Sequence, residues 1–172
     1  MTTRYGREYE ATKHLPLTGV AKLIRERLKS RWPEYRFSVR TSHRGARSMT
    51  VELTSGWAGD VYSPAWLARE RLLPHDNAPR PFLYSAPARA LLRDVESEVE
   101  AFNFDGSEPE SDYFHVRFYG EVRFRAEVVD AAKSRLEARL LATLQDARVA
   151  LLAGDKGHVL RVLETLEGSV QS

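Results

Sequence analysis

The 172-residue sequence contains no cysteine, and this absence excludes several kinds of site. Disulfides, thiolate metal ligands and cysteine nucleophiles all need the missing thiol. A chain without disulfides is typical of a reducing compartment, so we expect a cytoplasmic protein. We also expect no signal peptide and no membrane contact, because the N-terminus is polar and no run approaches the ~18 apolar residues of a membrane span.

The sequence also lacks the patterns that commonly mark catalysis. It has no Gly-x-Ser-x-Gly, Walker or dinucleotide-binding motif. Its five histidines never stand three or four residues apart, so no helical metal site is expected. We therefore expect a binding protein rather than an enzyme, with no catalytic residue, cofactor or metal. A metal-dependent hydrolase is the weakest alternative.

The net charge is only +2, but the two signs are separated along the chain. Residues 22–47 carry nine lysines and arginines against two glutamates, whereas residues 94–112 carry eight acidic residues and no basic one. Such separation favours an anionic partner at the basic segment. Alternatively, the two segments face each other and neutralise, and the sequence leaves both interpretations open.

The basic segment supplies the candidate site for nucleic acid or another partner. Arginine suits phosphate because its planar guanidinium can donate two hydrogen bonds at once. A tryptophan beside such charges can stack on bases, although a tryptophan at a helix end is more often part of a core. An ordinary solvated or acid-paired face is the alternative for the arginines. The candidate residues are Trp32, Arg36, Arg40, His43, Arg44 and Arg47.

A second candidate surface is acidic. Asp105, Glu108, Glu110 and Asp112 lie close together in sequence and could meet a basic partner protein. Carboxylates are also ligands for divalent cations, but this spacing does not match a calcium loop of the EF-hand type. We expect an interaction surface and no metal here.

Hydrophobic spacing predicts the elements of the first two thirds of the chain. A helix with Val20, Leu23, Ile24 and Leu28 on one face is expected from an N-cap at Thr18 to about Trp32. Alternation predicts strands over 35–40, 48–54 and 113–119, the first two as a hairpin. Prolines interrupt residues 55–87, where we expect one short helix over 64–72, and a further helix is expected over 88–102.

The C-terminal third is expected to be helical. Residues 126–152 and 159–166 have helical spacing and are separated by a glycine-containing turn. The predicted fold is therefore α+β: a small antiparallel sheet of about three strands, helices on one face, and a C-terminal helical hairpin. We divide it into a flexible segment 1–14, a core domain 15–122 and the hairpin 123–172. The hairpin can pack within the chain or form a homodimer.

Two stretches resemble a known family. One runs from Val20 through Phe37-Ser38-Val39-Arg40 to Val51, and the other combines Phe102–Ser107 with Asp112–Gly120. Together they resemble the large polyvalent protein-associated domains of the twenty-ninth type, over roughly residues 15–122. The resemblance implies a protein of a phage, plasmid or conjugative element, and it supplies no catalytic residue.

The family setting guides the expected function. Some proteins with such domains are thought to oppose the defences of a recipient cell. We therefore expect a protein that binds and blocks a host defence or nucleic-acid-processing complex. The alternative is a nucleic-acid-binding accessory protein of DNA transfer or replication, so the expected partners are a host protein complex, nucleic acid, or both.

Overall fold

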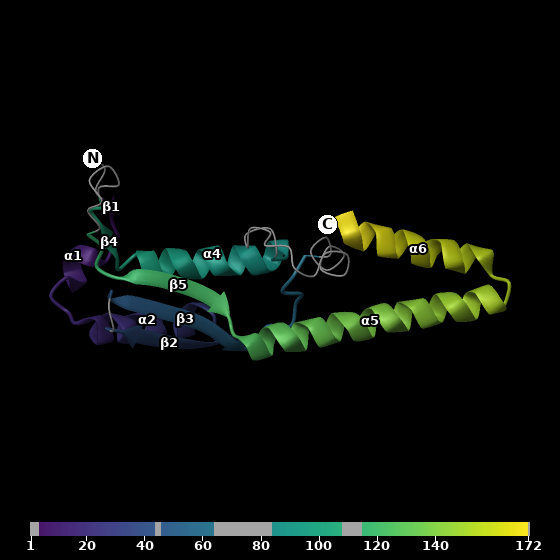
Figure 1. Ribbon diagram of the computed structural model, residues 1–172, viewed down its shortest axis with the longest axis horizontal. Helices are drawn as coiled ribbons and strands as arrows, with labels where there is room; N and C mark the ends of the chain where they lie inside the picture. The colour runs from purple at the N-terminus through teal and green to yellow at the C-terminus, as the bar shows by residue number, and fades with distance from the viewer. Residues whose placement is uncertain (1–3, 44–45, 64–83, 108–114, 172) are drawn as a thin grey trace. The chain divides into compact units, whose positions relative to one another are not determined.

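The computed structural model describes residues 4–43, 46–63, 84–107 and 115–171, with side chains as far as Glu164 (Figure 1). The chain divides into two compact units. The first unit comprises Met1–Trp57 and Ala90–Val128, and the second comprises Ala58–Arg89 and Val129–Ser172. Helices and small mixed sheets confirm the predicted α+β fold.

Helix α2 (Leu17–Arg31) packs one apolar face into the first unit. Val20, Ile24 and Leu28 are buried at the spacing that the sequence predicts. The expected N-cap at Thr18 is wrong, because the cap position is Pro16, which makes no side-chain capping bond. Proline is well suited to this place, since its fixed φ matches the start of a helix and it has no N–H to leave unpaired.

Three strands form the main sheet in the order β2-β3-β5. Strands β2 (Arg36–Ser42) and β3 (Ser48–Ser55) are antiparallel, with Val39 opposite Val51. Both valines are buried, as the predicted alternation requires. One face of the sheet therefore contributes apolar side chains to the core, and the other face is polar.

The third strand differs from the prediction in place and direction. Strand β5 (Tyr119–Phe124) begins where the predicted strand 113–119 ends, and it runs parallel to β3. The chain returns from β3 through helix α4 (Ala86–Glu100), and a crossover that contains a helix can bring the next strand back in the same direction. Residues 113 and 114 lie outside the described residues, and Val116 makes only an isolated bridge with Asp105.

The N-terminal segment, which we expected to be flexible, contains two short elements. Strand β1 (Arg4–Tyr5) pairs antiparallel with β4 (Phe104–Asp105), and helix α1 (Tyr9–Thr12) follows. Between them, the Gly6 amide donates to the Asn103 carbonyl over 2.9 Å. A Cβ at Gly6 would lie 2.3 Å from the Glu100 carbonyl oxygen, so only glycine fits this close approach.

The second unit contains the predicted helical hairpin. Helix α5 (Ala126–Leu152) and helix α6 (Lys156–Gln171) are joined by residues 153–155, where Gly154 has a φ of +76° (Figure 1). Ala150 and Val162 are buried in this unit. The short helix expected over 64–72 lies outside the described residues. Within the described ranges, no helix has both the length and the apolar character needed to cross a membrane.

A candidate anion-binding cleft

The first unit contains a cleft of about 350 Å³ between α1, the start of α2, the β2–β3 loop and the segment before β5. We call it the basic cleft. No aspartate or glutamate is among the described residues that line it. Its lining includes five side chains that carry or can acquire a positive charge: Lys13, His43, Arg47, His115 and Arg117.

Arg117 is the fixed charge of the basic cleft. Its guanidinium donates to the Thr12 hydroxyl over 3.0 Å, to the Phe102 carbonyl over 2.8 Å and to the Leu15 carbonyl over 3.3 Å. It also lies over the Tyr9 ring, with 5.5 Å between the guanidinium carbon and the ring centroid. Burial lowers its pKa, but an arginine stays protonated at any ordinary pH. Its positive charge therefore meets carbonyl dipoles, and no carboxylate is among these partners.

Aromatic rings hold the segment that carries Arg117 beside β4. Phe104 stacks on Tyr9 at a centroid distance of 5.3 Å, and His115 meets the Phe104 ring edge-on at 4.9 Å. The Arg117 amide donates to the Phe104 carbonyl over 3.0 Å. The position of Arg117 consequently depends on β4 and on α1, and α1 is about a hundred residues away in sequence.

The other three basic side chains stand at the margins of the basic cleft. His43 and Arg47 flank the β2–β3 loop and are exposed, while the Arg47 carbonyl accepts a hydrogen bond of 2.9 Å from the Tyr119 amide. Lys13 is also exposed and forms an ion pair of 2.6 Å with Glu10, which lies outside the cleft lining. Surface pairs of this kind are weak, so Lys13 can exchange Glu10 for another anion.

The basic residues predicted to bind a partner are divided between two places. His43 and Arg47 line the basic cleft, whereas Arg36 and Arg40 belong to β2 and are exposed on the polar face of the sheet. Arg40 shares the buried Glu52 with Arg123 and Arg125, at nitrogen–oxygen distances of 3.6, 2.9 and 3.3 Å. Arg44 lies outside the described residues.

Buried Glu52 gives the three arginines of this network one shared carboxylate. A hydrogen bond from Arg123 lowers the pKa of Glu52 despite the opposing effect of burial, and Arg125 adds to the decrease. Arg40 therefore shares a carboxylate with two other arginines, whereas Arg117 is held by a hydroxyl and by carbonyl groups. The polar sheet face is in consequence a weaker candidate for binding an anion than the basic cleft.

Trp32 lies at the end of α2 and is half-buried. Its ring contacts Phe37 at 6.1 Å between centroids, and the Arg31 guanidinium lies 4.8 Å above it. Tyr35 extends the same group, 6.3 Å from Phe37. Trp32 is thus engaged inside the chain on two sides, and it is not among the residues that line the basic cleft.

A wider hollow of about 460 Å³ lies beside α2, but its arginines are already paired. Arg27 binds Glu8 over 2.8 Å and Glu98 over 3.4 Å, and Arg31 also binds Glu98. Glu98 is buried, with 4% of its side chain exposed. Through Glu98, one residue of the acidic segment neutralises two arginines of the basic segment, as one interpretation of the charge pattern expected.

Only one member of the predicted acidic surface can be placed. Asp105 belongs to β4, and its carboxylate accepts a hydrogen bond of 2.9 Å from the Ser107 amide, which lowers the pKa of Asp105. Glu108, Glu110 and Asp112 lie outside the described residues. In the part of the chain that the structure describes, no three histidine, aspartate or glutamate side chains gather as metal ligands.

Sequence reasoning missed Lys13 and Arg117 as members of a site. Lys13 stood in a segment expected to be flexible, and Arg117 in a predicted strand. No local pattern distinguishes either one, because Arg117 meets Thr12 across a separation of 105 residues.

One family model matches the chain. The model of large polyvalent protein associated domain 29 matches residues 15–62, which include α2, β2 and β3. The resemblance is thereby confirmed over these residues, and the second stretch, within 102–120, lies outside the match. No curated protein and no solved structure matches the chain.

Proposed function

We propose that this chain is a non-catalytic binding protein of a mobile genetic element, and that its basic cleft holds backbone phosphates of a nucleic acid. The family match over residues 15–62 supports the setting. One observation carries the binding proposal: the basic cleft gathers cationic side chains without a carboxylate in its described lining. Elsewhere in the first unit, buried Glu52 and Glu98 already occupy neighbouring arginines.

The geometry fits a phosphate better than a base. Arg117 is held by carbonyl groups and acts as a fixed positive charge, whereas exposed Arg47 and Lys13 can turn toward an oxygen anion. Contacts of this kind position a nucleic acid without reading its sequence. Tyr9 and Phe104 line the same cleft, but they already stack on each other, so base stacking is not the main source of affinity.

Fluorescence anisotropy with labelled single- and double-stranded oligonucleotides tests this proposal. We expect Arg47→Ala to weaken binding by at least about tenfold, because a hydrogen bond to a charged group is worth about 1.5–3 kcal/mol. The slope of log K against log salt should fall by about one for each phosphate that the variant no longer binds. Lys13→Ala should act in the same direction.

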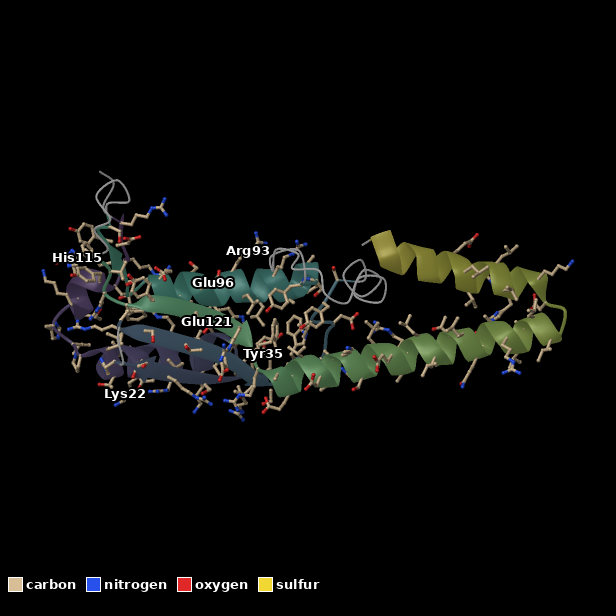
Figure 2. All side chains as sticks on the ribbon, viewed as in Figure 1. Lys22, Tyr35, Arg93, Glu96, His115 and Glu121 are labelled. Carbon is tan, nitrogen blue, oxygen red and sulfur yellow. The ribbon has the colours of Figure 1, made fainter. Side chains whose placement is uncertain are left out.

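A matched control is Arg93→Ala. Arg93 is an exposed arginine on α4, away from His115 at the cleft end of the first unit (Figure 2). The Arg93→Ala substitution removes one positive charge from the first unit, as Arg47→Ala does, but leaves the basic cleft unchanged. Equal losses of affinity in Arg47→Ala and Arg93→Ala would contradict a specific role for the cleft, as would undetectable binding of wild type at low salt.

The second candidate function is an inhibitor that binds a host defence or nucleic-acid-processing complex. Large exposed aliphatic side chains on α5 and α6 favour a protein partner for the second unit. If wild type binds no oligonucleotide, this proposal takes precedence.

We also propose that the chain forms a homodimer through its C-terminal helices. The same exposed side chains support it, since a patch of this kind in water usually marks an interaction surface. Self-association is compatible with either candidate function.

A further inference from the structure

The second half of α5 carries an apolar stripe that faces solvent. Leu141, Leu144, Leu151 and Leu152 are exposed to 60%, 56%, 64% and 79%. They lie beside, and not on, the face that includes buried Ala150 and half-buried Leu140 and packs within the unit. Helix α5 therefore has more apolar surface than its own unit covers.

Helix α6 extends this stripe on one flank of the hairpin. His158 on α6 meets Asp146 on α5 over 2.7 Å, which marks the opposite flank. A step of two residues turns a helix by about 200°, so Leu144 and Leu160 both point away from that ion pair. The outer apolar face, as we call it, comprises Leu141, Leu144, Leu151, Leu152, Leu160 and Leu163.

The charges beside the leucines identify the occupant. Glu137, Leu141, Leu144 and Arg148 follow one another at intervals of four, three and four residues, which is the seam spacing of a coiled coil. The spacing of these four residues is the same in both directions along the helix, but the two outer residues have opposite charges. Neither Glu137 nor Arg148 has an ion-pair partner among the residues that the structure describes.

We infer that α5 pairs with α5 of a second copy in antiparallel orientation, an inference that rests on the proposed self-association. The twofold axis then lies midway between Leu141 and Leu144. Leu141 then faces Leu144 of the second copy, and Glu137 faces Arg148 of the second copy, twice by symmetry. A parallel pair would instead place Glu137 against Glu137 and Arg148 against Arg148. Charge complementarity thus selects both the partner and the direction.

The exposed area is sufficient for a dimer of moderate affinity. Six leucines at these exposures offer on the order of 600 Å² per copy, near the low end of standard interfaces. Because area alone does not fix affinity, the experiment must span a range of protein concentrations.

The first measurement establishes whether the full chain self-associates. Sedimentation velocity over a hundredfold concentration range should show a monomer–dimer equilibrium, and Leu141→Ser/Leu144→Ser should weaken it at least about tenfold. Val149→Ser is the matched control, because Val149 is exposed to 66% on α5 but lies outside the seam. Circular dichroism checks that each variant keeps its helices.

The second measurement tests whether the two α5 helices are antiparallel. Because the chain has no natural cysteine, any disulfide that forms must join the introduced cysteines. In the antiparallel pair, position 137 is eleven residues from position 137 of the second copy, about 16 Å along the axis, which exceeds the reach of a disulfide. Mild oxidation should therefore cross-link an equal mixture of Glu137→Cys and Arg148→Cys but neither variant alone. Cross-linking of each variant alone, with none specific to the mixture, would overturn the antiparallel register while leaving self-association intact. A wild type that stays monomeric throughout would overturn both.

Discussion

Glu98 is predicted to be the main electrostatic support of the first unit. Its carboxylate is almost fully buried and meets Arg7 over 2.8 Å, Arg27 over 3.4 Å, and Arg31. Glu98→Gln keeps the shape of the side chain but leaves three arginines without their shared counter-ion. We expect this variant to fold with a lower free energy of unfolding.

The structure limits the size of the effect. Removing one partner of a fully buried ion pair costs about 3–5 kcal/mol. Here the arginine side chains are 58%, 32% and 50% exposed, so water can solvate them after the substitution. We therefore expect a loss of about 2–3 kcal/mol at neutral pH, still a large part of the 5–15 kcal/mol typical of a folded domain.

The loss should depend on pH. Burial alone would raise the pKa of Glu98, but the hydrogen bond and charge of Arg7, with the charges of Arg31 and Arg27, lower it. A lowered carboxyl pKa stabilises the fold fully above the unfolded value of about 4.3, and this contribution disappears as the pH falls through the folded value. The difference between wild type and Glu98→Gln should therefore be largest near pH 7 and shrink below about pH 4.

Urea unfolding followed by circular dichroism at pH 7 and in steps down to pH 3 measures both effects. Glu96→Gln is the control, because Glu96 lies on the same helix and its side chain is exposed, while burial and the charge of Glu100 raise its pKa. Its substitution should therefore not lower stability at pH 7. A Glu98→Gln deficit no larger than that of Glu96→Gln, or one that does not vary with pH, would refute the reasoning.

Two further substitutions test the packing around the basic cleft. Gly6→Ala should detach β1 and α1 and weaken oligonucleotide binding in the anisotropy assay, because the added Cβ would overlap the Glu100 carbonyl. Gly19→Ala is the control: its Cβ would lie 3.6 Å from the nearest neighbouring atom, so binding should stay unchanged. Phe118→Ala should lower stability by about 3–5 kcal/mol in urea unfolding, since Phe118 is only 1% exposed; a near-neutral result would show that this ring does not support the core.

The sequence by itself determined the elements whose apolar residues repeat locally. Helices α2, α4 and α5 and strands β2 and β3 each show a period of 3.6 or 2 within a few turns or residues. Their buried faces follow from that period, and Val39 and Val51 lie on the buried face of the predicted strands. The sequence also indicated His43 and Arg47, because both stand in the loop of a recognisable hairpin.

Only the tertiary structure decided the third strand and the composition of the site. Alternation over 113–119 predicted a strand, but pairing with β3 begins at Tyr119, where Gly120 allows β5 to approach Val99 and Glu100 of α4. Arg117 lies in the basic cleft because it donates hydrogen bonds to Thr12, which is 105 residues earlier in the sequence. Such contacts join residues about a hundred positions apart, so no local period encodes them. Whether an arginine is free or neutralised likewise depends on which glutamate the fold buries beside it.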